Sequence, residues 1–163
     1  MVYGIYFSSL RVKKFIEKKL KELEKFHFVV HEHNATHWHH DLRLEVDGVL
    51  KSWAIPKGME LNEKENRLGI MVEDHDLKYL SFEGIIPKGE YGSGTIKIWD
   101  KGLYEMSCES KEKNSKVEQE KKIKEALSEG KIKIEFFGNK LKGLFEMIRL
   151  KNNRNWLIFH VKS

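Results

Sequence analysis

Hydrophobic residues follow two periods along this chain, which predict a β-rich body flanked by helices. Between residues 9 and 25, Val12, Ile16, Leu20 and Leu23 recur at helical spacing, so we expect an amphipathic N-terminal helix with Ser8 or Ser9 as its cap. From Phe26 the period changes to two, which is typical of strands. The alternating segments are FHFVV, HHDLRLEVDG, VLKSWAI, RLGIMVE, TIKIWDKGLYEM, KIKIEFF, LKGLFEMIRL and WLIFHV.

These segments favour an antiparallel fold, because many short strands with few helices do not fit a parallel βαβ sheet. We expect a mainly β fold, a compact antiparallel β-barrel of about eight strands with an N-terminal helix and one short internal helix. The internal helix is VEQEKKIKEALSEG, ended by Gly130. Asp100-Lys101-Gly102 is predicted to form a hairpin turn. The chain of 163 residues fits a single domain, 1–163.

Composition narrows the function classes only a little. The 30 Lys and Arg against 25 Asp and Glu give a net charge of +5, which permits a polyanionic partner without requiring one. A single cysteine excludes an internal disulfide. No apolar run reaches the ~18 residues of a membrane span, and the apolar start lacks the features of a signal peptide. We therefore expect a cytoplasmic monomer with no membrane association.

Histidines cluster early in the chain, where six of the eight fall between residues 27 and 40. Alternation along HHDLRLEVDG places His39, Asp41 and Arg43 on one face of a strand and apolar side chains on the other. His33 precedes His39 by six residues across a turn, so it can complete a site from the neighbouring strand. We predict that His33, His39 and Asp41 bind a divalent transition metal. A polar surface without a resident ion is the alternative interpretation of this cluster.

Arg43 favours the metal site over a polar surface without an ion. A guanidinium beside a cation is repelled unless an anion lies between them, and a phosphate can bind both. His75 is flanked by acidic residues, which we expect to keep it protonated, so it can bind a phosphate oxygen or protonate a leaving group. His31 is in phase with His33 and is a candidate supporting residue. The glycine-rich loop at residues 87–94 lacks the GK[ST] of a P-loop and is interpreted as a tight connection.

These residues resemble a known family. The runs FVVHEHNATHWHHDLRLEVDGVLKSWAIPKG, RLGIMVEDHDLKYLSFEGIIPKGEYGSGTIKIWDKG, KLKGLFEMIR and NWLIFH are similar to the phosphoesterase domain of bacterial DNA ligase D and its free-standing archaeal relatives. The resemblance covers roughly residues 26 to 160. It implies a β-barrel with a hydrophobic core on one side and a polar, metal-holding crater on the other.

The resemblance also implies an activity, namely manganese-dependent healing of DNA or RNA 3′ ends. Such enzymes remove a terminal 3′ ribonucleoside from a primer strand and then the remaining 3′-phosphate, which exposes a 3′-OH. Neither the polymerase nor the ligase domain of the bacterial protein is found in these 163 residues. We therefore expect a repair ligase or polymerase to act in trans. Spacing alone does not select manganese over cobalt, nickel or zinc.

Individual roles follow from the same resemblance. His33, His39 and Asp41 match metal ligands, in agreement with the alternation argument. The other residues that the resemblance places in the crater are Arg43 and His75 on the scissile phosphate, Tyr79 at a further active-site position, and Lys57 and Arg67 along the wall.

Three further residues are supporting candidates next to these positions. Glu73 and Asp74 can orient His75 or merely hydrate the end of a strand. Trp38, in the turn beside the metal site, is the candidate for stacking on a terminal base.

Two other functions use the same residues. HxD with a further His resembles the 2-His-1-carboxylate triad of non-haem iron oxygenases, although the third ligand there usually lies far downstream. A non-catalytic module could hold a 3′-phosphate in the same crater. Of the three hypotheses, only the phosphoesterase predicts release of phosphate from a labelled 3′-phosphate primer.

Overall fold

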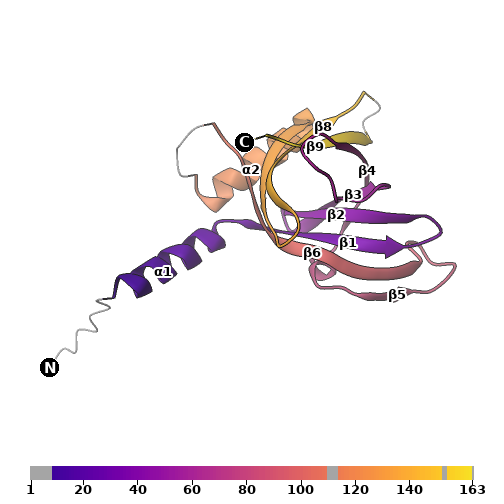
Figure 1. Ribbon diagram of the computed structural model, residues 1–163, viewed down its shortest axis with the longest axis horizontal. Coiled ribbons are helices and arrows are strands. Elements are labelled where there is room, and N and C mark those ends of the chain that lie inside the picture. Colours follow the sequence, from indigo (N-terminus) through magenta and orange to yellow (C-terminus); the bar gives the residue numbers. More distant parts are fainter. Residues whose placement is uncertain (1–8, 110–113, 152–153, 163) are drawn as a thin grey trace.

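Antiparallel strands form the body of the protein, and both helices lie outside it (Figure 1). The computed structural model describes residues 9–109, 114–151 and 154–162. Its elements are α1 (Leu10–Leu23), β1 (Phe26–Asn34), β2 (Trp38–Val46), β3 (Val49–Ile55), β4 (Asn66–His75), the 3-10 helix η1 (Leu77–Leu80), β5 (Gly84–Ile86), β6 (Gly94–Met106), α2 (Lys116–Glu129), β7 (Lys131–Phe137), β8 (Lys142–Arg149) and β9 (Asn155–His160).

The sheet closes on itself into a barrel. In the described part of the chain the strand order is β1-β2-β3-β4-β9-β8-β7-β6, and β6 pairs back with β1. Closure therefore joins eight strands and removes the free sheet edges between them. Short β5 pairs with the first residues of β6, outside this ring. The prediction of a mainly β, eight-stranded antiparallel barrel is confirmed.

The predicted hairpin turn at Asp100-Lys101-Gly102 is wrong, because β6 runs through it without interruption. The Asp100 carboxylate accepts backbone N–H bonds of 2.7 to 3.2 Å from residues 139–141, in the turn between β7 and β8. At Gly102 a Cβ atom would lie 2.6 Å from the carbonyl oxygen of Phe137. Both residues thus allow a long strand to pass close to a neighbouring turn.

Alternation along β2 separates the core from the outer face of the sheet. Leu42 and Leu44 point into the barrel with the T-shaped pair of Trp53 and Trp156, whose ring centroids lie 5.8 Å apart. Asp41, one position away from Leu42, lies on the other face, as predicted. Buried core residues on β2 therefore fix the direction of the polar side chains between them.

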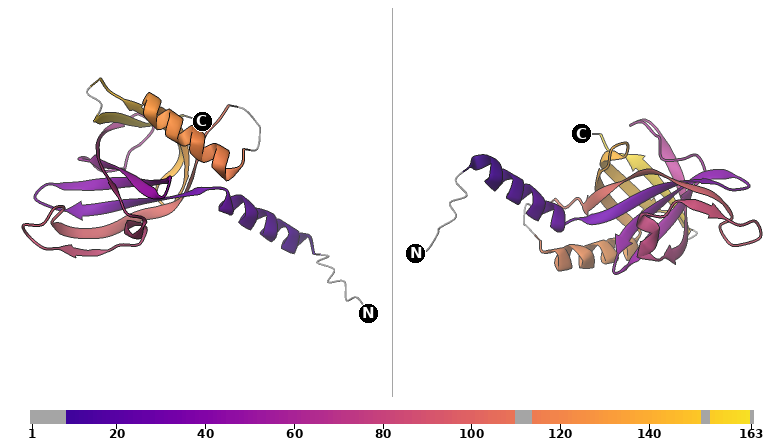
Figure 2. Two further views of the ribbon diagram at one scale, coloured as in Figure 1. Left: turned by 180° about the vertical axis from the view of Figure 1, so that it is seen from behind. Right: turned by 90° about the horizontal axis from the view of Figure 1, so that it is seen from below.

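The two helices differ in how they contact the barrel. In α2 a capping box joins Ser115 and Glu118, and Ile123 and Leu127 are buried. Gly130 follows α2 with φ of 84°, so it forms the left-handed cap that the sequence predicts. The Ser9 side chain caps α1, which buries none of its described residues and extends away from the barrel (Figure 2). Both predicted helices are confirmed.

Within the described ranges, neither α1 nor α2 combines the length and the apolar character that a membrane-spanning helix needs.

Replacing Asp100 by alanine tests its structural role. The Asp100→Ala change leaves three backbone N–H groups without their carboxylate acceptor, so we expect the free energy of unfolding to fall by about 3 kcal/mol. Urea denaturation measures the change. The matched control, Glu22→Ala, removes a carboxylate from an exposed ion pair on α1 and is expected to change stability by less than about 0.5 kcal/mol. Equal effects of the two substitutions would contradict the assignment.

Candidate active site

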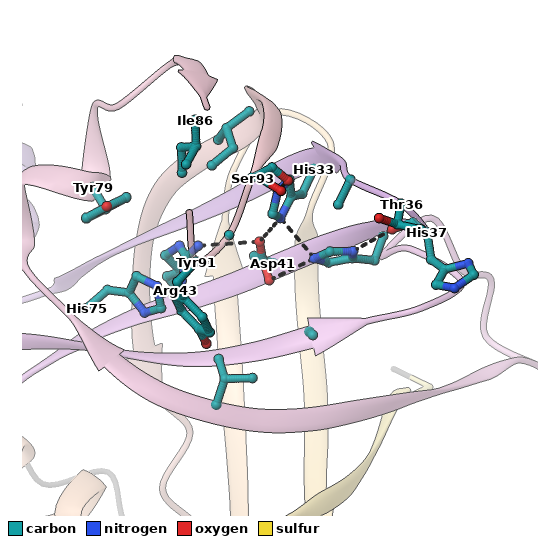
Figure 3. A pocket seen from close by; sticks show the side chains of 16 residues that line it. His33, Thr36, His37, Asp41, Arg43, His75, Tyr79, Ile86, Tyr91 and Ser93 are labelled. Atoms are coloured by element: carbon teal, nitrogen blue, oxygen red, sulfur yellow. Dashed lines mark hydrogen bonds and ion pairs between the residues drawn. The ribbon is translucent and has the colours of Figure 1, made fainter. Parts of the chain in front are cut away.

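A cavity of about 460 Å³ opens on the outer face of β1 and β2 (Figure 3). We call it the crater. Its walls come from the turn between β1 and β2, from β2, β3 and β4, from η1, and from β5 to the start of β6. Its lining residues are His33, Ala35, Thr36, His37, His39, Asp41, Arg43, Ala54, Val72, His75, Tyr79, Ile86, Tyr91, Gly92, Ser93 and Ile96.

His33, His39 and Asp41 meet at the centre of the crater. The register of β1 and β2 places His33 opposite His39 and His31 opposite Asp41. One potential ligand atom from each of the three predicted ligands lies within 4.8 Å of the others. Asp41 Oδ2 is 3.4 Å from His33 Nδ1, and Asp41 Oδ1 is 3.5 Å from His39 Nε2. The structure therefore brings together the three side chains that the sequence selected.

Backbone carbonyl oxygens fix which nitrogen of each ring carries a proton. His33 Nε2 donates to the Ser93 carbonyl at 3.1 Å, and His39 Nδ1 donates to the His37 carbonyl at 2.9 Å. Since a carbonyl oxygen only accepts hydrogen bonds, His33 Nδ1 and His39 Nε2 carry lone pairs in the neutral rings. These two nitrogens lie 3.1 Å apart. With both rings neutral, two lone pairs and a carboxylate thus converge on one point, which is an environment that suits a cation.

The same arrangement shifts the pKa values of these groups. Burial by itself would raise the pKa of Asp41, but contacts from His33 and His39 and the charge of Arg43 place it well below its ordinary value. The hydrogen bond with Asp41 is the largest cause that raises the pKa of His39. Asp41 is therefore ionised across the physiological range and supplies the negative charge of the site.

Arg43 lies next to this cluster and is held on three sides. Its side chain is buried, with Nε donating to His31 Nδ1 at 3.2 Å and Nη1 donating to Ser52 Oγ at 3.0 Å. Nη2 is 3.4 Å from Asp41 Oδ2. His31 Nε2 in turn donates to the Phe82 carbonyl at 3.0 Å. Burial and the charge of Arg43 lower the pKa of His31 to about 4, so His31 is a neutral acceptor that orients the guanidinium.

His75 and Tyr79 form the opposite side of the crater from His37 (Figure 3). The His75 ring packs edge-on against Tyr79 at 5.2 Å, and the Arg43 guanidinium lies 5.6 Å from the Tyr79 ring centre. The Asp76 side chain caps η1 and so helps to place Tyr79. His75 Nδ1 donates to the Glu73 carbonyl at 2.9 Å, so its Nε2 carries the lone pair when the ring is neutral.

The prediction that acidic neighbours keep His75 protonated is wrong. Burial is the main cause that lowers its pKa, and the positive charge of Arg43 lowers it further. Glu73 raises the pKa, through its carbonyl and its charge, but does not outweigh these effects. His75 is therefore predominantly neutral near pH 7 in the free protein.

Two other predicted wall residues take part in different contacts. Arg67 donates from Nε to the Gly58 carbonyl at 3.0 Å and from Nη2 to the Glu60 carbonyl at 2.6 Å, which secures the loop after β3. Lys57 is exposed in that loop. Neither of them is among the residues that line the crater. Their roles toward a substrate stay predictions.

Trp38 and Asp74 also lie outside the crater lining. The Trp38 ring packs against His40 at a centroid distance of 4.8 Å and lies over Gly58. Asp74 pairs with Lys51 at 3.0 Å rather than with His75. Base stacking by Trp38 stays a prediction.

Four contributors to the site were not predicted from the sequence. Ser52 lies opposite Arg43 in the β2–β3 register, and a small polar residue within the apolar strand VLKSWAI was the available signal. The Phe82 and Ser93 carbonyls depend on loop geometry, which no residue pattern reveals. Tyr91 lies in the glycine-rich loop that was interpreted only as a connection, yet this loop forms part of the crater wall.

Chemically, the crater offers a cation position and a fixed guanidinium on either side of one carboxylate. A tetrahedral oxyanion can bind a cation through one oxygen and accept hydrogen bonds from arginine through another. The arrangement therefore suits phosphate esters.

The electrostatics of His75 are testable in the metal-free protein. We expect NMR titration to give His75 a pKa below its ordinary value of 6.5, and Arg43→Gln to raise that pKa because a nearby positive charge is removed. Arg11→Gln removes an exposed charge on α1 and serves as the matched control, with no change expected at His75. A wild-type pKa above 6.5, or equal effects of both variants, would show that another group controls His75.

Comparisons with known proteins agree with this geometry. The family model described as the DNA ligase D 3′-phosphoesterase domain matches residues 31–149. The chain is 43 % identical over 141 residues to the multifunctional non-homologous end joining protein LigD of Mycolicibacterium smegmatis, covering 83 % of this chain and 17 % of that protein. Identity is 39 % to LigD proteins of Mycobacterium tuberculosis, over 136 residues, and of Pseudomonas aeruginosa, over 139 residues.

Each of these two matches also covers 83 % of this chain, but only 16 % and 15 % of the respective relatives. The chain thus spans about a sixth of the length of the relatives it matches. The matched region contains the central cluster of the crater and strands β2 to β8. The chain therefore belongs to the DNA ligase D 3′-phosphoesterase domain family.

Proposed function

We propose that this protein is a divalent-metal-dependent phosphoesterase that heals DNA or RNA 3′ ends. It removes a 3′-terminal ribonucleoside and then the 3′-phosphate, leaving a 3′-OH. The observation that carries the proposal is the convergence of His33, His39 and Asp41 next to the buried guanidinium of Arg43. Family membership and the non-homologous end joining function in the relatives' names support the choice of substrate.

His33 Nδ1, His39 Nε2 and the Asp41 carboxylate are the groups that would hold the metal. Two imidazole nitrogens and one carboxylate suit manganese and several other divalent transition metals, and we propose Mn²⁺. A bound divalent cation supplies Lewis acidity toward a phosphate oxygen and activates water. The Ser93 and His37 carbonyls preserve this function, since they hold each ring in the tautomer that presents a lone pair.

Arg43 neutralises charge on the phosphate. Its Nε and Nη1 hydrogen bonds fix the plane of the guanidinium before substrate arrives, which avoids reorganisation during the reaction. Nη2 lies 3.4 Å from Asp41 Oδ2, and Arg43 is among the residues that line the crater. Lysine at this position cannot make the same planar set of bonds.

The protonation of His75 changes when substrate binds, so that it can act as a proton donor. It is mainly neutral in the free protein, and the negative charge of a phosphate ester in the crater would raise its pKa and favour proton uptake at Nε2, most strongly for the dianionic 3′-phosphate. The imidazolium then donates to a phosphate oxygen or to the leaving oxygen. In the first reaction water adds to phosphorus and the bond to the nucleoside 5′-oxygen breaks. In the second reaction, water displaces the 3′-oxygen of the primer.

The charge of the chain is consistent with contacts to a polynucleotide backbone. The sequence holds 25 lysines, and lysine contacts to phosphate are independent of base sequence. We propose that the protein acts as a monomer in the cytoplasm on primer-template ends, and that a repair ligase or polymerase uses its product in trans.

Loss of one metal ligand tests the activity. With a labelled 3′-phosphate primer and Mn²⁺, we expect phosphate release by the wild type, none after chelation, and a loss of more than about 10³-fold in His39→Ala. His27→Ala removes a histidine that pairs with Glu45 outside the crater, and it should keep full activity.

Wild-type turnover in His39→Ala would refute the site. Tight binding of the primer without phosphate release would instead favour a non-catalytic end-binding module. Oxygen uptake with an organic co-substrate would favour an oxygenase.

Substitution of Arg43 tests the phosphate contact. Both Arg43→Ala and Arg43→Lys should lower kcat/KM by about 10² to 10³, because lysine retains the charge but not the bonds to His31 and Ser52. Arg11→Lys on the exposed face of α1 is the matched control. Near-normal activity of Arg43→Lys would show that charge alone suffices.

A further inference from the structure

The crater contains an aromatic side chain, Tyr91, that has no role in the proposed reaction. Tyr91 lines the crater, yet 77 % of its surface is exposed, an unusual degree for a large ring beside a buried ionic cluster. Figure 3 shows it on the Arg43 side of the crater. Its phenol is near enough to Arg43 to affect the electrostatics of the guanidinium. An exposed ring thus lines the same side of the crater as the guanidinium proposed to bind the phosphate.

Tyr79, the other tyrosine of the crater, does not offer a free ring face to a ligand. The Tyr79 ring packs against His75 at 5.2 Å and against Phe82 at 5.2 Å, and Arg43 lies over it. Tyr91, by contrast, makes no ring stacking, cation–π contact or hydrogen bond through its side chain with any described residue. Its ring faces are therefore open to a planar ligand.

The loop that carries Tyr91 is fixed against the hairpin of β1 and β2. Successive turns join Glu90 to Pro87 and Ser93 to Glu90, through N–H to carbonyl bonds of 3.2 and 3.1 Å. The Ser93 carbonyl accepts from His33. At Gly94, with φ of 129°, a Cβ atom would lie 2.4 Å from the Asn34 carbonyl oxygen, so only glycine permits this approach. These contacts fix the backbone of the loop that carries Tyr91 at the edge of the crater.

Trp38, which the sequence favoured for stacking, is less suitable. Its ring is already packed on His40 and Gly58, and it does not line the crater.

We propose that Tyr91 is the stacking platform for the base of the nucleotide that carries the 3′-phosphate. The inference rests on the proposed function and adds to it a contact that recognises the substrate by its base. Every base has a π-face, so stacking on Tyr91 favours nucleotide ends over simple phosphate esters without selecting a base. The contribution appears in KM, since the ring touches a part of the substrate that does not react.

A double-mutant cycle that combines Tyr91→Ala with removal of the terminal base from the substrate tests this contact. The substrates are two 3′-phosphate primers, one with a normal terminal nucleotide and one with a stable tetrahydrofuran unit that lacks the base. For the wild type, we expect base removal to raise KM about 10-fold with little change in kcat. In Tyr91→Ala, KM for the normal primer should rise by about the same factor, and base removal should have no further effect.

Two variants serve as controls. Tyr91→Phe retains the ring and should behave as the wild type. Ile85→Ala truncates an equally exposed side chain on β5 that does not line the crater, and it should change neither parameter. Additive effects of Tyr91→Ala and base removal would overturn the proposal. A fall in kcat at unchanged KM would also overturn it, because the phenol would then act in the reaction itself.

Failure of the proposed function gives a different result. If the wild type releases no phosphate from either primer, the same cycle is measured as dissociation constants by fluorescence anisotropy. Coupling between Tyr91 and the base in binding would support the stacking contact even then. Independent effects, or no effect of Tyr91→Ala, would contradict it.

Discussion

The site depends on two imidazole rings and one carboxylate that converge next to the guanidinium of Arg43. When both rings are neutral, His33 and His39 present lone pairs to each other, because the Ser93 and His37 carbonyls accept their ring protons. Asp41 is held ionised beside them. Such a cluster is suited to a cation, and the contacts around it fix the side chains in place.

Packing inside the barrel holds the side chains of this cluster in position. Leu42 and Leu44 alternate with Asp41 and Arg43 on one strand, so burial of the apolar side chains orients the polar ones. Closure through β6 and β1 brings the loop before β6 against the turn between β1 and β2. The chemistry thus lies on the outer face of the sheet, and its positions are set by the packing of the inner face.

Much of this organisation was predictable because it depends on local periodicity. Alternation along HHDLRLEVDG was sufficient to place His39, Asp41 and Arg43 on one face, and the spacing to His33 added the third residue of the cluster. Long-range contacts were not predictable in the same way. Asp100-Lys101-Gly102 has the composition of a hairpin turn, but contacts with residues 137–141 keep the strand continuous. Similarly, the charge state of His75 follows from burial and from Arg43 rather than from its neighbours in sequence.

Metal binding measured apart from catalysis tests the central claim most directly. Titration of the protein with Mn²⁺, followed by calorimetry and by the electron paramagnetic resonance signal of the free ion, should give one site per chain. Asp41→Asn keeps the shape of the side chain but removes its charge, and it should weaken that site at least about 100-fold. A single Mn²⁺ site of unchanged affinity in Asp41→Asn would contradict the account, because the ion would then be bound elsewhere.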